Sequence, residues 1–142
     1  MKLCDVMTKE VTSLNVDDTV EKAAQMMKEN NVGSIPVCRD GKIAGIITDR
    51  DITLRSIAEG KNISSIKVSS IMSSNPVTGN LNMDVHEAAK LMAENQIRRL
   101  PVVENNAVVG MLSLGDLAVE PKFENEAGDA LSQISENTTS SI

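Results

Sequence analysis

Two short stretches of the chain end an apolar run with a hydroxyl residue and place an aspartate three positions later. The first stretch, GIITDRDI, contains Thr48 and Asp51, and the second, GMLSLGDL, contains Ser113 and Asp116. A hydroxyl and an acid at this spacing can satisfy the free N–H groups at the start of a helix, as in a capping box. A helix start also attracts phosphate, and an aspartate can accept two hydrogen bonds from a vicinal diol. The two pairs therefore predict either plain helix caps or sites that suit a ribose with an attached phosphate.

Metal binding and catalysis have less support in the residues. Asp49 and Asp51 form an acid-x-acid pair, but residues two apart on a helix do not share a face, and no companion ligands are visible. His86, the only histidine, falls on the polar side of a predicted helix, so we expect it to be solvated. The sequence contains no Ser-His-Asp arrangement, no P-loop and no Gly-rich dinucleotide fingerprint. We therefore expect no metal site, no catalytic residue and no enzymatic activity.

The two stretches belong to an internal repeat. Positions 65 residues apart carry the same residue along much of the chain, for example Met7 and Met72, or Gly45 and Gly110. The match runs without a gap through both hydroxyl-and-aspartate endings. Such self-similarity predicts two copies of one unit of about 50 residues each.

Each copy predicts the order β-α-β-β-α. A short extended piece at 11–14 or 76–79 precedes a helix, with Asp17, Asp18 or Asn82 available as its cap. Apolar residues recur at helical spacing in both copies: Val20, Ala23, Ala24 and Met27, then Val85, Ala88, Ala89 and Met92.

Two strands and a closing helix complete each copy. The strands flank Asp40-Gly41 in the first copy and Asn105-Asn106 in the second, which are turn signals of a hairpin. The closing helix is expected over 49–58 in the first copy and is shorter in the second. Beyond the repeat, a weak amphipathic helix carrying Leu131 and Ile134 should precede a polar, frayed end.

These features resemble a tandem pair of CBS domains, the nucleotide-sensing Bateman module, of the stand-alone bacterial type. The β-α-β-β-α order, the MM…NNVxxIP stretch and the G-h-h-[ST]-x-x-D-h ending, where h is apolar, carry the resemblance over residues 3–119. It implies an α+β fold in which two repeats face one another across a pseudo-twofold axis, with ligand in the cleft between them. The expected boundaries are 1–60 for the first repeat, 61–70 for a linker, 71–119 for the second repeat and 120–142 for a tail.

The resemblance implies a ligand that contains adenosine: AMP, ADP, ATP, S-adenosylmethionine or an NAD-type dinucleotide. No cofactor is obligatory, and the nucleotide acts as a regulatory ligand. By position, Asp51 and Asp116 are expected to bind the ribose hydroxyls. Thr48 and Ser113 are expected to contact the ribose or the phosphate. The adenine is expected near Ile35 and Pro36 or Leu100 and Pro101, and near the backbone at Thr12 or Val77.

Arginines make the two copies unequal. Arg98 and Arg99 precede the strand proline of the second copy, where the first copy has Gly33 and Ser34. Basic residues at this position resemble those that neutralise ligand phosphates in the family, and the planar guanidinium suits that task. Arg50 is a further candidate. The alternative is that these side chains are simply solvated.

The composition disfavours some classes of binding partner. The chain of 142 residues carries a net charge of −6, its only aromatic residue is Phe123, and 41% of its residues are hydrophobic. An acidic surface without stacking side chains disfavours nucleic acid and anionic membranes. No apolar run approaches the ~20 residues of a membrane span, so the cytoplasm is expected. Cys4 and Cys38 do not form a disulfide framework, and a redox role for them stays open.

Two functions remain compatible with the sequence. The first is a regulatory module that senses an adenosyl ligand and acts on another protein in trans. The second is a structural dimerisation module with a vestigial ligand site. In either case a homodimer formed through the helices is expected, because the AAQMM and AAKLM stretches are strongly hydrophobic.

Overall fold

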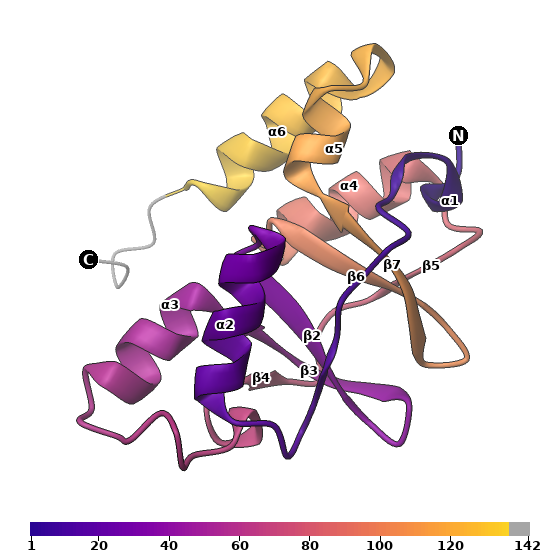
Figure 1. The fold of residues 1–142 in the computed structure, drawn as a ribbon. Helices are drawn as coiled ribbons and strands as arrows, with labels where there is room; N and C mark the ends of the chain where they lie inside the picture. Colours follow the sequence, from indigo (N-terminus) through magenta and orange to yellow (C-terminus); the bar gives the residue numbers. More distant parts are fainter. Residues whose placement is uncertain (137–142) are drawn as a thin grey trace. The chain divides into compact units, whose positions relative to one another are not determined.

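The computed structural model describes residues 1–136 and divides the chain into two compact units, each described below by itself (Figure 1). The first repeat lies in the unit formed by Thr12–Pro76 and Asn105–Val108. The second repeat lies in the unit formed by Met1–Val11, Val77–Glu104 and the chain from Val109 onward. The predicted polar end of the tail falls on 137–142, outside the described residues.

The unit of the first repeat contains a four-stranded sheet in the order β1-β2-β3-β4. Strand β1 (Leu14–Asn15) runs parallel to β2 (Ser34–Arg39), while β3 (Lys42–Thr48) is antiparallel to both β2 and β4 (Ser73–Ser74). Helix α2 (Val20–Asn30) follows β1. After β3, helix α3 (Asp49–Ile52) continues into one π-helical turn, Thr53–Ile57. A 3-10 turn, Val68–Ser70, precedes β4.

The unit of the second repeat contains a three-stranded sheet in the order β5-β6-β7. Its strands are β5 (Gly79–Asn80), β6 (Arg99–Glu104) and β7 (Ala107–Ser113). Helix α4 (Val85–Glu94) lies between β5 and β6 in the chain, and α5 (Leu114–Ala118) follows β7. The α+β content and the β-α-β-β-α order predicted from the sequence are therefore confirmed in both repeats.

Both hairpins turn where the sequence predicts. Asp40, Asn105 and Asn106 adopt left-handed backbone conformations, as does Gly41 at φ 77°. Aspartate, asparagine and glycine tolerate this conformation better than other residues, which explains why these pairs close two-residue turns.

The predicted caps of the long helices are wrong. Thr19 caps α2 by accepting a hydrogen bond from the Lys22 N–H at 3.1 Å, and Asp84 caps α4 by accepting from the His86 N–H at 2.8 Å. Asp18 instead accepts from the backbone N–H of Asn15 at 2.8 Å, since it lies in the turn before the helix.

Each unit is completed by a segment from outside its own repeat. Helix α1 (Leu3–Val6) and Thr8 belong with the second repeat, where Thr8 and Met111 exchange backbone hydrogen bonds of 2.9 Å in each direction. Strand β4, which lies at the start of the second repeat in the sequence, pairs with β3 of the first. The compact units therefore do not follow the limits of the sequence repeats.

Glycine permits these added segments to approach. A Cβ on Gly45 would lie 2.6 Å from the sulfur of Met72, and a Cβ on Gly110 would overlap the sulfur of Met7. No side chain can occupy that space, so the glycines of the repeated GhhT and GhhS motifs are needed for packing.

The predicted linker, 61–70, is partly structured. Val68 is fully buried, and the backbone N–H of Val20 donates to the carbonyl oxygen of Ile66 at 3.0 Å. This part of the chain therefore packs against α2 instead of forming a free connection.

The predicted amphipathic helix beyond the repeat is present as α6 (Glu124–Ile134). It packs against α4 and α5, and Ala127 and Ala130 are buried. Figure 1 shows α6 lying along α4. No helix among residues 1–136 is long and apolar enough to cross a membrane.

A leucine in α1 tests the assignment of the N-terminal segment to the second repeat. Leu3 is fully buried among the core residues of that unit. We expect Leu3→Ala to lower the free energy of unfolding by about 2 to 5 kcal/mol, as for other buried leucines. The matched control is Leu131→Ala, since Leu131 is 46% exposed and should cost much less. Equal unfolding midpoints in urea for the two variants would contradict the packing.

Candidate functional site

Capping boxes form at the end of β3 and at the end of β7, as the sequence predicts. The hydroxyl of Thr48 accepts from the Asp51 N–H at 3.1 Å, and the carboxylate of Asp51 accepts from the Thr48 N–H at 2.9 Å. The corresponding distances for Ser113 and Asp116 are 3.0 and 2.9 Å. Each aspartate is therefore fixed against the backbone of a strand end.

The start of a neighbouring strand lies beside each box. The backbone N–H of Asp49 donates to the carbonyl oxygen of Gly33 at 2.9 Å, just before β2. In the other unit, the N–H of Leu114 donates to the carbonyl oxygen of Arg98 at 3.0 Å, just before β6. The residue before β2 and the residue before β6, which is Arg98, are thus held beside the capping box of the same repeat.

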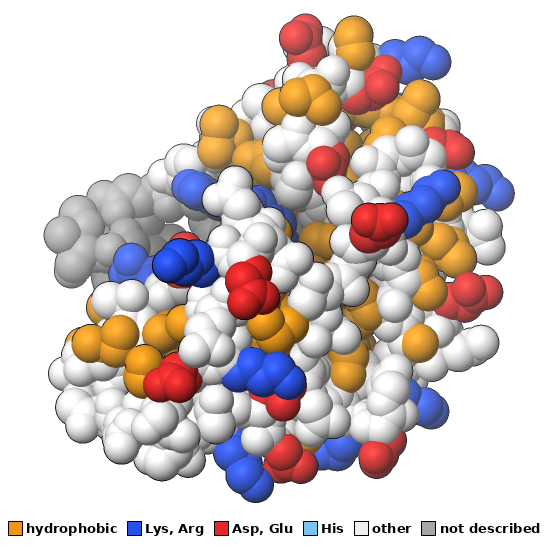
Figure 2. All heavy atoms as spheres, in the orientation of Figure 1, with side chains coloured by type: hydrophobic (Ala, Val, Ile, Leu, Met, Phe, Trp, Pro, Cys, Tyr) orange, Lys and Arg blue, Asp and Glu red, His pale blue; other side chains and the backbone are white. Residues whose placement is uncertain are grey.

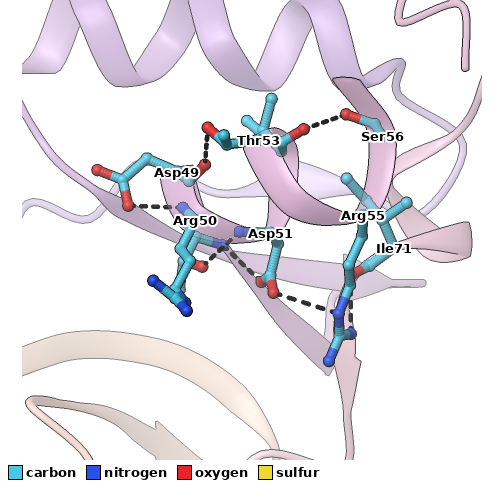
Figure 3. A network of polar contacts seen from close by, with 9 residues as sticks. Asp49, Arg50, Asp51, Thr53, Arg55, Ser56 and Ile71 are labelled. Carbon is cyan, nitrogen blue, oxygen red and sulfur yellow. Dashed lines mark hydrogen bonds and ion pairs between the residues drawn. The ribbon is translucent and has the colours of Figure 1, made fainter. Parts of the chain in front are cut away.

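Arg55 distinguishes the first site from the second (Figure 3). One oxygen of the Asp51 carboxylate is used in the capping box, and the other lies 3.7 Å from Nε of Arg55. Arg55 in turn donates to the carbonyl oxygen of Ile71 at 3.2 Å. The position 65 residues after Arg55 is Glu120, and Asp116 has no ion-pair partner within 4 Å among residues 1–136. A ribose diol would therefore compete with Arg55 for the Asp51 carboxylate, whereas it would meet no such competitor among residues 1–136 at the Asp116 carboxylate.

Arg55 was not among the site residues expected from the sequence, although the signal was present. Asp51 and Arg55 are four residues apart on one helical segment, and such residues lie on the same face. The side chain of Asp51 is only 14% exposed and that of Arg55 is 55% exposed. The contribution of the pair to stability is therefore small, and its relevance is to how Asp51 can bind.

The charge at the strand start also differs between the sites. A Cβ on Gly33 would lie 3.0 Å from an oxygen of Asp49, so this carboxylate occupies the neighbourhood of Gly33. In the second repeat Leu114 replaces Asp49, and Arg98 replaces Gly33. One site thus presents an acid where the other presents a base.

The three candidate arginines are exposed. The guanidinium of Arg99 donates to the carbonyl oxygen of Arg98 at 3.1 Å, and none of the three forms an ion pair with another residue of 1–136. Arg50 donates through its backbone N–H to the carboxylate of Asp49 at 2.8 Å. In Figure 3 its guanidinium points away from the Asp51 carboxylate. These cations are available to an anion.

The side chains predicted near adenine are part of the core. Ile35 is 1% exposed and Leu100 is fully buried, and the prolines that follow them are buried as well. What these strand positions can offer a ligand without rearrangement is their backbone. Thr12 is exposed and its hydroxyl lies 3.4 Å from the amide oxygen of Asn30, while Val77 is half-buried against the core of its unit.

The structure separates the acids of the acid-x-acid pair. In Figure 3, Asp49 turns to the N–H of Arg50 and Asp51 turns to Arg55. Asp51 also accepts from the N–H of Thr48. Among residues 1–136 there is no group of three or more His, Cys, Asp or Glu side chains that could hold a metal ion.

His86 has more contacts than the sequence predicts. Its side chain is 63% exposed, but Nδ1 lies 3.0 Å from a carboxylate oxygen of Glu126 on α6. Its ring packs edge-on against Phe123, with 5.4 Å between ring centroids. The histidine therefore contacts the segment that covers α4, with no partner that would suggest catalysis.

The cysteines lie in different units, and both are half-buried. Burial raises the pKa of the Cys38 thiol, and a hydrogen bond with Ser13 lowers it by less. A raised pKa reduces the thiolate fraction at neutral pH, which disfavours a reactive role for Cys38.

Comparison with known proteins identifies the family. The CBS domain model matches residues 3–57 and 68–121, so the chain belongs to the CBS domain family and carries two CBS domains in tandem. The resemblance inferred from the repeated motifs is confirmed. CBS domains are regulatory and not usually catalytic, which agrees with the expected lack of enzymatic activity at the level of the family.

Two bacterial relatives match over nearly their whole length. The CBS domain-containing protein YhcV of Bacillus subtilis is 47% identical over 131 residues, covering 92% of this chain and 93% of YhcV. The uncharacterized protein YlbB of the same organism is 43% identical over 137 residues, covering 95% and 92%.

Solved structures share the fold. The CBS domain protein PAE2072 of Pyrobaculum aerophilum, complexed with AMP, matches with a TM-score of 0.80 and 26% identity over 90% of this chain and 98% of that one. Hypoxic Response Protein I, solved with two coordinated zinc ions, matches with a TM-score of 0.78 and 29% identity over 84% and 98%.

Proposed function

We propose that the protein is a regulatory module that binds an adenosine-containing nucleotide at the polar ends of β3 and β7. The observation that carries the proposal is the duplicated aspartate, fixed by backbone hydrogen bonds of 2.9 Å at the same point of each repeat. A carboxylate held in this way can accept hydrogen bonds from both hydroxyls of a ribose with little further ordering. The complex of the similar protein PAE2072 with AMP supports the same ligand class.

We further propose that the two sites are unequal. At the second repeat, Asp116 forms no ion pair with a residue of 1–136, and Arg98 and Arg99 are exposed next to the box. At the first repeat, Arg55 lies beside Asp51, and Asp49 adds a negative charge. A phosphorylated ligand should therefore prefer the second repeat, with Arg50 the remaining cation for the first.

We propose that the output passes to another protein or through a change of assembly, and that the assembly is a homodimer. Much of the AAQMM and AAKLM stretches is used by the cores of the units, because Ala23, Met27, Ala88 and Met92 are buried and Ala24, Met26 and Leu91 are partly buried against them. The exposed apolar residues Leu54 and Ile57, at 45% and 58%, are better candidates. A similar cyanobacterial CBS-CP12 protein is hexameric, so larger assemblies exist among proteins of this fold. A strict monomer in light scattering at micromolar concentration would contradict the dimer.

Asp51→Glu and Asp116→Glu separate ligand binding from helix capping. Glutamate is the usual acid of a capping box, so each variant should keep its cap and unfold within about 0.5 kcal/mol of the parent. The longer side chain moves the carboxylate by roughly one bond, which should weaken AMP binding by about tenfold or more at the affected site because a misplaced acceptor loses a charged hydrogen bond. Calorimetric titration measures the affinity for AMP, and urea unfolding measures the stability that depends on the helix cap.

If both single variants and the double variant bound AMP as tightly as the parent, the ribose assignment would be wrong. That result would favour the alternative function, a structural dimerisation module. Asp51→Ala and Asp116→Ala serve as comparisons, since they remove the acceptor together with the carboxylate half of each capping box, while Thr48 and Ser113 still cap the helices. Each should cost about 0.5 to 2 kcal/mol in stability.

Arg98→Ala and Arg99→Ala test the phosphate role. Loss of a hydrogen bond from a charged donor costs about 1.5 to 3 kcal/mol, or roughly tenfold to a hundredfold in affinity. We expect AMP to bind each variant about tenfold more weakly, at the lower end of this range, because both side chains are exposed. Adenosine, which lacks the phosphate, should bind these variants as it binds the parent. Lys122→Ala is the control, since it removes one exposed cation from the same unit. Equal losses for AMP and adenosine, or equal effects of all three variants, would contradict the assignment.

A further inference from the structure

A pocket of about 480 Å³ lies in the unit of the first repeat, away from the nucleotide site. It is lined by the closing end of the β2–β3 hairpin and by the segment that contains β4. Lys42, on this pocket, is six residues from Thr48 along β3, which corresponds to roughly 20 Å of strand. The volume is within the usual range for sites of small molecules.

The walls of the pocket are fixed by backbone contacts. Strand β4 pairs with β3 through Gly45 and Ser74, and the Asn75 N–H donates to the carbonyl oxygen of Ala44 at 3.3 Å. Met72 forms an apolar wall of the pocket. Because it already lies against Gly45, it cannot move closer to β3. The pocket is therefore part of the packed unit and not a space between mobile loops.

Two cations line the pocket as a direct cross-strand pair. Arg39 of β2 and Lys42 of β3 are register partners, and like charges in that arrangement repel each other. Neither side chain forms an ion pair with any other residue of 1–136. Asp40 lies between them in the turn but is not among the lining residues. An anion bound between the two cations would relieve the repulsion.

The polar residues that face the pocket are also uncommitted. Ser69, Ser74 and Asn75 are among its lining residues, and none of their side chains makes a hydrogen bond to another of residues 1–136. Hydroxyl and amide groups can donate to phosphate oxygens alongside the cations. No acidic side chain of the described residues lines the pocket. Although the chain carries a net charge of −6, this pocket therefore gathers cationic and neutral hydrogen-bond donors.

The second repeat lacks the basic pair. Glu104 stands at the position that matches Arg39, and Ala107 at the position that matches Lys42. The pair is thus particular to the first repeat and does not follow from the CBS fold.

We infer that this pocket binds a phosphate-bearing small molecule, separately from the nucleotide. The phosphate lies between Arg39 and Lys42, within reach of the serine and asparagine donors. The wall formed by Met72 and Ile43 takes an apolar part of the ligand. Such a site would give the module a second input that does not depend on Asp51 or Asp116.

The test is a titration of phenyl phosphate and of inorganic phosphate, followed through backbone amide shifts in NMR spectra. Both probes should shift the amides of Ala44, Ser69, Ser74 and Asn75, and phenyl phosphate should bind more tightly because of the apolar wall. The double variant Arg39→Ala/Lys42→Ala should weaken phenyl phosphate by at least about tenfold. The control Lys28→Ala/Lys61→Ala removes the same charge from exposed sites of the same unit and should leave binding unchanged.

Absence of these amide shifts would overturn the inference, as would an equal loss in both double variants, which would indicate diffuse attraction. Inorganic phosphate that binds as tightly as phenyl phosphate would overturn the role of the apolar wall. Titration of the Asp51→Glu/Asp116→Glu variant keeps the two sites distinct. Phenyl phosphate should still bind it, and loss of binding there would show that the pocket is not a separate site.

Discussion

The close packing of a methionine against a glycine is the contact on which each unit depends. Met72 approaches Gly45, and Met7 approaches Gly110, at distances that leave no room for a Cβ. Through these contacts a segment from outside the repeat completes the sheet edge and the core of each unit. Leu3 and Val68, equivalent positions of the two segments, are fully buried as a result. A single CBS repeat of this chain, cut at its sequence limits, would lack these core residues.

This packing also determines where polar groups can lie. The middle of β3 pairs with β4 through Gly45 and Ile46, and its C-terminal end passes into α3 through the Thr48 capping box. The Asp51 carboxylate therefore lies just beyond one end of β3, and the basic pair of the hairpin lies at the other end. The second repeat uses the same frame with different charges, Glu120 in place of Arg55 and Arg98 in place of Gly33. The duplication supplies two equivalent frames, and the substitutions between the copies make their ligand preferences different.

The sequence predicted most of the fold because the local signals agree with the tertiary structure. Helical spacing placed α2 and α4, the Asp40-Gly41 turn placed the first hairpin, and the hydroxyl-and-aspartate pairs placed both capping boxes. The caps at Thr19 and Asp84 were missed because several cap-forming residues lie side by side there and the choice depends on the preceding turn. The exchange of the N-terminal segments and the pocket at the hairpin end depend on contacts between residues far apart in sequence, which periodicity does not encode. The roles of the candidate site residues stay predictions.

Recognition of adenosine-containing nucleotides is the central claim. Thermal unfolding with AMP, ADP, ATP, NAD, NADP, S-adenosylmethionine and, for comparison, GMP and CMP tests it most directly. A ligand that binds only the folded state at a hundred times its dissociation constant stabilises that state by about 2.7 kcal/mol. We predict that at least one adenosine-containing compound raises the unfolding temperature by several degrees while GMP and CMP do not. Unchanged unfolding temperatures with every adenosine compound, or equal increases with guanine and cytosine nucleotides, would contradict the claim.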